Sequence, residues 1–523
     1  MSLYTWSWLF LLAYVVAMTG FGVVGSRRVA GADDFATARG AYGPFLLALA
    51  FASTAASGAT FLGLPGLTYS FGLSTLWIAF LYPLGIYLGV LISQRTIARY
   101  GNLSGARSIP EYLGDRYQSE GLRISAAVFS LILLFYLAGQ LVAGLVMFEM
   151  MLGLSKGWAL AITTAVLLGY VTLGGAHADI LTDGAQGLLM VALALAILVM
   201  FLLGIGSGGL GNLLENLRNQ DPQLVQNFHP ATAITASVWA YLSLVIAHIP
   251  LGLLPHIGNK LWALKDERSR SRFLIMAFTF GLILPAITLG GALARGVLGD
   301  SLISGGGGAN TALPALFIEI FPTWIAALLG VGILSAVMST ADGLVISTSQ
   351  VFANDIYRRS IAPRLHPDQE QAALDRNVLV ISRVVTALTL VGSATLAWFV
   401  VDMNVVLLVW AGVGGFIAAL MGPLVMGSVW RGVTRAGALA GFWTGAILFI
   451  LIHAEIISGE WLSGTSLESF GTWFAFNAQS PYSAATIAGL TAVAVTVLVS
   501  RCSLSLPESH LDAVLGPCSG FCR

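Results

Sequence analysis

The sequence predicts an all-α integral membrane protein with about 13 transmembrane helices. Hydrophobic residues make up 57% of the 523 residues and charged residues only 10%, whereas soluble domains are usually about 45–50% apolar and about 25% charged. The apolar residues gather in long runs, and Lys and Arg gather between alternate runs. The net charge is zero, so composition gives no sign of a basic surface for nucleic acid.

A helix needs about 20 mostly apolar residues to cross a bilayer. Thirteen runs approach this length, and we number them as spans 1 to 13. The predicted spans are 5–24, 43–64, 75–93, 124–152, 157–173, 181–203, 235–255, 273–298, 324–350, 379–401, 405–430, 436–454 and 482–500.

Basic residues support this count and predict an orientation. They cluster after spans 1, 3, 7, 9 and 11 and in the C-terminal tail, with Arg27 and Arg28 after the first span and Lys260 and Lys265 after the seventh. Loops on the cytoplasmic side are enriched in Lys and Arg. We therefore expect a plasma-membrane protein with its N-terminus outside and its C-terminus in the cytoplasm. The start of the chain lacks the features of a cleaved signal peptide.

Spans 2 and 7 contain residues that interrupt helices. Span 2 has six Ser, Thr or Gly residues from Ser53 to Gly63, and span 7 closes with Gly252, Pro255 and Gly258. Each is the first helix of a five-helix block, spans 2–6 and spans 7–11. Matching interruptions in two halves are typical of inverted-repeat transporters, and an odd number of helices inverts the second block. Gly and Pro that only permit close packing would leave the same pattern.

Span 9 carries a cluster of polar residues that includes Ser339, Thr340, Asp342 and Gly343. Two adjacent hydroxyls, together with carbonyls freed at the break in span 2, suit a small hard cation, which prefers oxygen ligands. Hydroxyls that bond back to their own helix are the alternative. Carboxylates inside membrane spans are rare and often mark ion pathways. Asp183 in span 6 and Asp342 are therefore predicted to take part in ion coupling.

Three further side chains leave two interpretations open. Gln140 in span 4, His256 at the end of span 7 and Trp410 in span 11 either contact a solute or hold neighbouring helices together. The sequence contains no P-loop, nucleophile elbow, zinc-protease motif or kinase motif. A transporter that is not driven by ATP is therefore favoured over a pump or an enzyme.

The hydroxyl pair belongs to a longer motif. The stretch from Ala336 to Asp342, followed by Asp355-Ile-Tyr357, resembles the hallmark of the sodium–solute symporter family, whose members carry proline, pantothenate, sugars and short carboxylates with sodium. Four more stretches agree with the family pattern, and the resemblance covers roughly residues 30–445. These stretches are Ser57–Gly66, Ser108–Tyr117, Gly174–Gly187 and Gly422–Gly441.

The resemblance implies a ten-helix inverted-repeat core of the amino-acid-transporter type, formed by spans 2–11, and a sodium ion bound between spans 2 and 9. The implied sodium ligands are the backbone oxygens of Ser53, Ala56 and Ala336 and the hydroxyls of Ser339 and Thr340. Asp183 matches an acidic residue that supports cation coupling in relatives. Where some relatives hold a second sodium with hydroxyls, this chain has Asp342 and Gly343.

The expected organisation follows from the resemblance and the spans. It comprises a peripheral first helix with its inner loop (1–41), a first repeat (42–203), an outer loop (204–234), a second repeat (235–430), two peripheral helices (431–500) and a cytoplasmic tail (501–523). The tail holds the three cysteines, Cys502, Cys518 and Cys522, which are too few for a structural zinc site.

The expected function is sodium-coupled uptake of a small organic solute by alternating access. The positive ends of the half-helices favour a carboxylate, an amino acid or a vitamin-like acid. The predicted solute contacts are Thr54, Ser57, Gln140, His256 and Trp410. Two alternatives stay open: proton-coupled symport through Asp183 or Asp342, and a membrane sensor that binds solute without moving it. No obligate protein partner is evident from the sequence.

Overall fold

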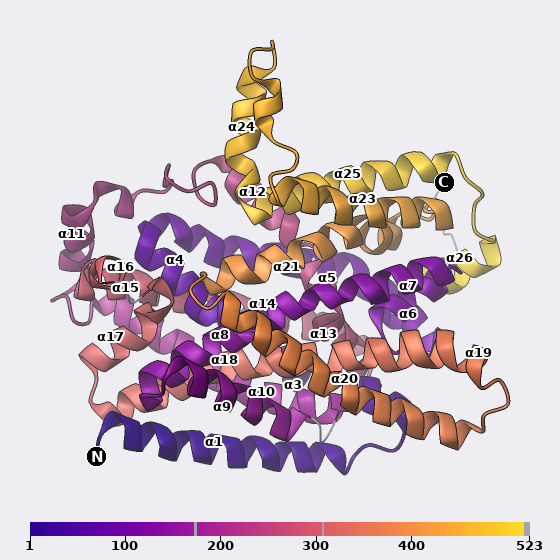
Figure 1. Ribbon diagram of the computed structural model, residues 1–523, viewed down its shortest axis with the longest axis horizontal. Helices are drawn as coiled ribbons and strands as arrows, with labels where there is room; N and C mark the ends of the chain where they lie inside the picture. The colour runs from indigo at the N-terminus through magenta and orange to yellow at the C-terminus, as the bar shows by residue number, and fades with distance from the viewer. Residues whose placement is uncertain (172–174, 306–307, 517–523) are drawn as a thin grey trace.

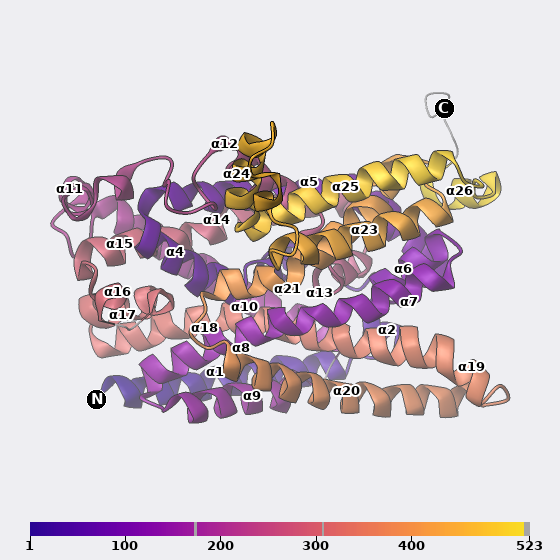
Figure 2. The ribbon, with the colours of Figure 1, turned by 45° about the horizontal axis from the view of Figure 1, so that its top comes forward.

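The computed structural model describes residues 1–171, 175–305 and 308–516, and within these residues the fold is helical and contains no β-strand. The long helices run side by side along the longest axis of the molecule (Figures 1 and 2). Short helices gather at the two ends, with α11 (Leu210–Gln220) and α17 (Ala312–Ile320) at one end and α19 (Ala362–Leu365) and α26 (Glu508–Leu515) at the other.

Each predicted span corresponds, in the described residues, to one helix or to two helices that follow each other. The corresponding helices are α1 (Leu3–Ser26), α3 (Pro44–Ala55) with α4 (Leu64–Phe71), α5 (Leu76–Ser104), α7 (Glu120–Phe129) with α8 (Leu133–Leu152), α9 (Lys156–Val171), α10 (Gly175–Leu203), α12 (Val238–His248) with α13 (Pro255–Gly258), α14 (Arg270–Ile283) with α15 (Leu289–Leu298), α18 (Thr323–Gln350), α20 (Gln371–Phe399), α21 (Val405–Leu420), α23 (Arg435–His453) and α25 (Pro481–Arg501).

By length and composition, ten helices of the described chain can cross a membrane, or eleven if α12 and the bent segment after it form one span. The breaks account for two of the three missing spans, and the third, predicted at 157–173, is a shorter apolar helix over Lys156–Leu168. The first break limits α3 to 12 residues, which is about 18 Å of helix against a hydrocarbon core of about 30 Å. The chain is therefore a multi-pass membrane protein, and the count of thirteen spans stays a prediction.

The outer helices expose large apolar side chains, as a lipid-facing surface requires. Leu12 on α1 is 65% exposed, Ile275 on α14 is 67% exposed and Leu388 on α20 is 66% exposed. In the interior, α10 packs against α1, α3 and α18, and α8 packs against α18 and α21. The broken helix α3–α4 therefore lies in the middle of the bundle.

The segments predicted as loops and tail contain short helices. The helix α11 lies in the predicted outer loop 204–234, and α24 (Glu468–Ala478) projects away from the bundle (Figure 1). In the tail, α26 packs against α5, and Arg431 forms ion pairs with Asp512 at 2.8 Å and Glu508 at 3.1 Å. Cys502 is an exposed free thiol, whereas Cys518 and Cys522 lie outside the described residues.

Candidate functional site

The first broken helix unwinds in the middle of its predicted span. The helix α3 ends at Ala55, Ala56 has non-helical backbone angles (φ −91°, ψ 77°), and helix resumes in the π-helical turn Ala59–Gly63. Gly58 lies in this gap, where an added Cβ would lie 2.9 Å from Gln140 Oε1. The Gly58 amide donates a hydrogen bond to the same oxygen at 2.9 Å. The glycine thus lets the unwound turn approach α8 closely, and Gln140 then holds it there.

Two hydroxyls of α18 meet this break. Ser339 Oγ donates to Ser53 Oγ at 3.3 Å, and Thr340 Oγ1 donates to the backbone oxygen of Thr54 at 2.9 Å. All four side chains are completely buried. The hydroxyls therefore contact the neighbouring broken helix, and these two bonds run between helices instead of back along α18.

The remaining predicted sodium ligands lie on the same two segments. Ala56 is in the unwound turn and Ala336 is one turn before Thr340 on α18; they are 2% and 0% exposed. The contact between the two segments is made by hydroxyl and carbonyl oxygens, which are the atoms that a small hard cation prefers. The structure thus brings the segments of all five predicted ligands together, and its donor set fits sodium.

Asp183 connects this contact to a cluster of charges. Thr54 Oγ1 donates to Asp183 Oδ2 at 2.6 Å, and Lys260 Nζ lies 2.8 Å from the same oxygen and 2.5 Å from Asp179 Oδ2. The three charged side chains are at most 8% exposed. The Oδ1 atoms of both carboxylates are buried and have no hydrogen-bond partner among the described residues.

Asp179 is not among the residues predicted from the sequence, and Lys260 is predicted to lie in an inner loop. Lys260 instead lies buried in the 3-10 turn Asn259–Ala263, which directly follows the second broken helix. One signal could have identified the cluster: Asp179 and Asp183 are four residues apart and share one face of α10. An inward-facing pair of carboxylates requires a buried cation nearby, and Lys260 is the basic residue next to the break in span 7.

Asp342, the second predicted coupling residue, lies beside α1. It is 2% exposed, and its helix α18 packs against α1, which carries the buried Tyr14. Tyr14 in turn accepts a hydrogen bond from Gln186 Nε2 at 2.6 Å. The helix α1, which was predicted to be peripheral, therefore brings a polar side chain to the interface of α10 and α18.

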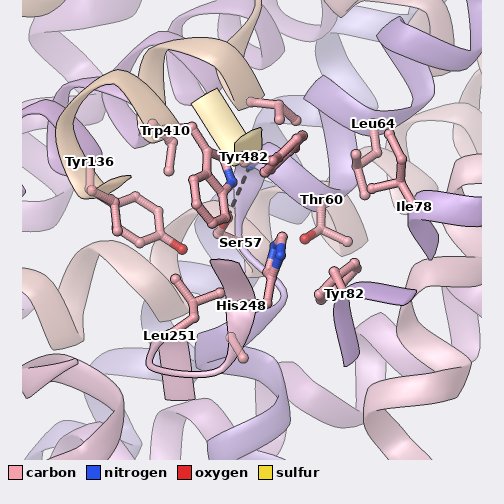
Figure 3. Close-up of a pocket in the computed structure, with 15 residues that line it drawn as sticks. Ser57, Thr60, Leu64, Ile78, Tyr82, Tyr136, His248, Leu251, Trp410 and Tyr482 are labelled. Atoms are coloured by element: carbon pink, nitrogen blue, oxygen red, sulfur yellow. Dashed lines mark hydrogen bonds between the residues drawn. The ribbon is translucent and has the colours of Figure 1, made fainter. Parts of the chain in front are cut away.

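A cavity of about 40 Å³ lies next to the unwound turn. Its lining includes Ser57 and Thr60 from the first broken helix, His248 and Leu251 from the second, and Trp410 from α21 (Figure 3). None of its 15 lining residues, all of which lie in the described part of the chain, is Asp, Glu, Lys or Arg. The arrangement provides a small, uncharged site between the two helix breaks.

Two of the five predicted solute contacts, Ser57 and Trp410, line this cavity. Thr54 and Gln140 do not; both are fully buried and form hydrogen bonds with other protein groups. Sequence analysis did not single out the other aromatic lining residues, because aromatic residues are common in membrane helices and no spacing in the sequence brings them together. They are Tyr82, Tyr136, His248 and Tyr482.

His256, the fifth predicted solute contact, does not line this cavity. It lines a second cavity of about 20 Å³ together with Asp179 and Lys260. Its ring packs edge-on against Tyr136 at a centroid distance of 5.3 Å, and neither ring nitrogen has a hydrogen-bond partner among the described residues. His256 thus stands between the solute cavity, which Tyr136 lines, and the cavity beside the charge cluster.

Known proteins resemble this chain over most of its length. The sodium/proline symporter of Escherichia coli (strain K12) is 29% identical over 457 residues, which are 84% of this chain and 86% of that protein. The sodium/pantothenate symporter of Haemophilus influenzae is 27% identical over 411 residues, 78% of this chain and 81% of that protein. These relatives are transporters and not enzymes.

A solved structure has a similar fold. A Na+-coupled sialic acid symporter in its substrate-bound outward-open state superposes with a TM-score of 0.73 at 19% identity, covering 96% of this chain and 99% of that chain. Residues 35–445 match the model of the Sodium:solute symporter family. This match covers the broken helix, the hydroxyl pair of α18 and the charge cluster described above. The chain belongs to the sodium:solute symporter family.

Proposed function

We propose that this protein is a symporter that couples inward sodium flow to the uptake of a small organic solute by alternating access. The observation that carries the proposal is the oxygen-only contact between Ser339 and Thr340 of α18 and the end of α3, directly before the unwound turn. A sodium ion bound there would take the place of these hydrogen bonds and join the two helices through its ligands.

Coupling would follow from the position of the unwound turn. Thr54 links the turn to the ion contact, and Ser57, three residues later, lines the solute cavity. A change in the turn on sodium binding would therefore act directly on the solute cavity. Asp183, bonded to the Thr54 hydroxyl, would place negative charge beside the sodium, and the membrane potential would add about 2.3 kcal/mol per charge per 100 mV.

The proposed topology has thirteen spans, with the N-terminus outside and the C-terminus in the cytoplasm. Spans 2–6 and 7–11 would form the two inverted repeats, each starting with a broken helix. The breaks after Ala55 and after His248 support this arrangement, because paired breaks at corresponding positions are typical of such repeats. Cysteine labelling at positions 218 and 364, from opposite sides of the membrane, tests it; labelling from one side at both positions contradicts it.

The sodium site is tested by Ser339→Ala combined with Thr340→Ala in reconstituted vesicles. We expect loss of sodium-dependent uptake or a large rise in the sodium concentration needed for half-maximal uptake. Ser335→Ala is the matched control, because Ser335 is also buried on α18 but donates to Val331 O of its own helix. Unchanged sodium dependence in the double variant would refute the site.

Proton coupling is the second candidate, since the unpartnered Oδ1 atoms of Asp179 and Asp183 are buried next to the ion contact. The same vesicles distinguish the two. Uptake driven by a pH gradient in sodium-free buffer would favour protons, whereas uptake that requires sodium at every pH would favour sodium.

A further inference from the structure

The solute cavity is lined by four packed rings, Tyr82, His248, Trp410 and Tyr482, which we call the aromatic cluster (Figure 3). His248 lies at its centre, with ring centroids 4.6 Å from Trp410, 5.5 Å from Tyr82 and 5.6 Å from Tyr482. Trp410 and Tyr482 are 4.6 Å apart. Each of the four residues is at most 6% exposed, so a solute in the cavity meets rings and not bulk water.

Tyr482 comes from α25, which lies beyond residue 445, where the family match ends. Two hydrogen bonds attach the start of α25 to α12, the helix that ends with His248. Thr486 Oγ1 donates to Ser243 O at 2.6 Å, and Trp239 Nε1 donates to Ser483 Oγ at 2.7 Å. A helix predicted to be peripheral therefore holds one ring of the cavity in place.

His248 presents a hydrogen-bond acceptor to the cavity. Its Nδ1 lies 2.7 Å from the backbone oxygen of Leu244. Because a carbonyl oxygen only accepts, Nδ1 carries the hydrogen. No carboxylate of the described residues lines the cavity, and a protonated imidazole buried without an anion is costly, so the ring is neutral. The other nitrogen, Nε2, has no hydrogen bond to another described residue, so it is available as an acceptor in a ring that lines the cavity.

The cavity offers no compensation for a net charge on the solute. Within the described parts of the chain, no acidic or basic side chain lines it, and burying an unpaired charge is strongly unfavourable. The amides at the start of the half-helix are also occupied: Gly58 N donates to Gln140 Oε1 and Ala59 N donates to Ser57 Oγ. The partial positive charge expected there for a solute carboxylate is therefore already used by protein oxygens.

We propose that the aromatic cluster selects solutes that carry no net charge and that direct an N–H or O–H group at His248 Nε2, and that Tyr482 of α25 determines this specificity. Zwitterionic amino acids and uncharged polyols satisfy both conditions, whereas monoanions and organic cations fail the first. The inference deepens the proposed function and rests on it.

The test uses the full-length protein in vesicles with an inward sodium gradient and five radiolabelled probes. L-proline and myo-inositol carry no net charge and have donors; N,N-dimethyl-L-proline carries no net charge but has no donor; pantothenate is an anion and choline a cation. We expect accumulation of at least one of the first two and of none of the other three. Preferred accumulation of pantothenate, choline or N,N-dimethyl-L-proline, or of no probe at all, overturns the proposal.

Variants then test the two residues with the accepted probe. His248→Phe removes the acceptor, and we expect about a 5- to 30-fold rise in the solute half-saturation concentration, the effect of one lost buried hydrogen bond. Tyr482→Ala should change the ratio of the affinities for proline and inositol. A loss of stability alone would leave this ratio unchanged. Tyr482→Phe keeps the ring and guards against misfolding. Leu490→Ala is the control, since Leu490 is on the same helix and 45% exposed.

The outcomes separate this inference from the proposed function. If the accepted probe accumulates equally well without sodium, the coupling is refuted and the pattern across the panel still supports the selection. If accumulation requires sodium but His248→Phe and Tyr482→Ala leave both the half-saturation and the solute preference unchanged, the selection is refuted and the coupling stands.

Discussion

Replacing Lys260 by Met should destabilise the protein by about 3–5 kcal/mol, the usual cost of breaking a buried ion pair from one side. The Lys260 side chain is 3% exposed and its ammonium contacts both Asp179 and Asp183. Met keeps most of the apolar stem and removes the charge, so the loss comes from two carboxylates left buried without a cation. Unfolding of the purified protein in micelles, titrated with a denaturing detergent and followed by tryptophan fluorescence, measures the change.

A double-mutant cycle isolates the electrostatic part of this loss. With Asp179→Asn added to Lys260→Met, one carboxylate remains, and it still accepts the Thr54 hydroxyl. We expect the double variant to be more stable than Lys260→Met alone by about 1–3 kcal/mol, the range of coupling within one ion-pair network. Additive effects, with a coupling energy below about 0.5 kcal/mol, would contradict the reasoning.

The stability of the Lys260→Met variant should also depend on sodium. Wild-type Asp179, Asp183 and Lys260 together place one net negative charge beside the ion contact, and Lys260→Met places two there. NaCl should therefore stabilise the Lys260→Met variant more than it stabilises the wild type, because a ligand that binds only the folded state adds stability according to its affinity. Choline chloride at equal ionic strength is the control, and equal stabilisation by both salts would argue against a sodium ion near Asp183.

Two further variants test the packing around the first break. Gly291→Ala would place a Cβ 2.0 Å from the backbone oxygen of Pro65, so we expect the free energy of unfolding to fall by about 1–3 kcal/mol from overpacking. Gly392→Ala on α20 is the control, because no described atom lies within 4 Å of the added Cβ, and it should be neutral or slightly stabilising. Equal losses in the two variants would contradict the prediction. Asn404→Ala removes two side-chain hydrogen bonds, the cap on the backbone amide of Val406 and the bond to the backbone oxygen of Gly63. The free energy of unfolding should fall by about 0.5–2 kcal/mol. An unchanged stability would mean that water replaces both bonds.

Local sequence was enough to predict the parts of the site that depend on local backbone chemistry. Gly and hydroxyl residues in one apolar run identified the unwound turn, because such residues weaken a helix wherever they lie. The adjacent hydroxyls Ser339 and Thr340 identified the facing surface of α18. The number of spans was harder to predict, since a break divides one apolar run into pieces such as α3 that are too short to cross the membrane alone.

Contacts between distant segments were not predictable in the same way. Lys260 lies 77 residues after Asp183, the nearer of its two carboxylate partners in the sequence. Its position after the end of an apolar run made a cytoplasmic loop the simpler interpretation. Tyr482 meets Trp410 only because α25 packs against α21 and α12. Hydropathy reports whether a helix enters the membrane, but the direction in which each side chain points depends on helix rotation, which packing decides.

The unwound turn also constrains how ion and solute can influence each other. Under the proposed function, both ligands act on the segment between Thr54 and Ser57. Coupling through a shared element is reciprocal: if sodium raises the affinity for solute by some factor, solute must raise the affinity for sodium by the same factor. Because this equality holds wherever the coupling lies, the informative quantity is how the factor changes when the turn is altered. A substitution between Thr54 and Ser57 that lowers the factor would identify the broken helix as the coupling element, and an unchanged factor would place the coupling outside this turn.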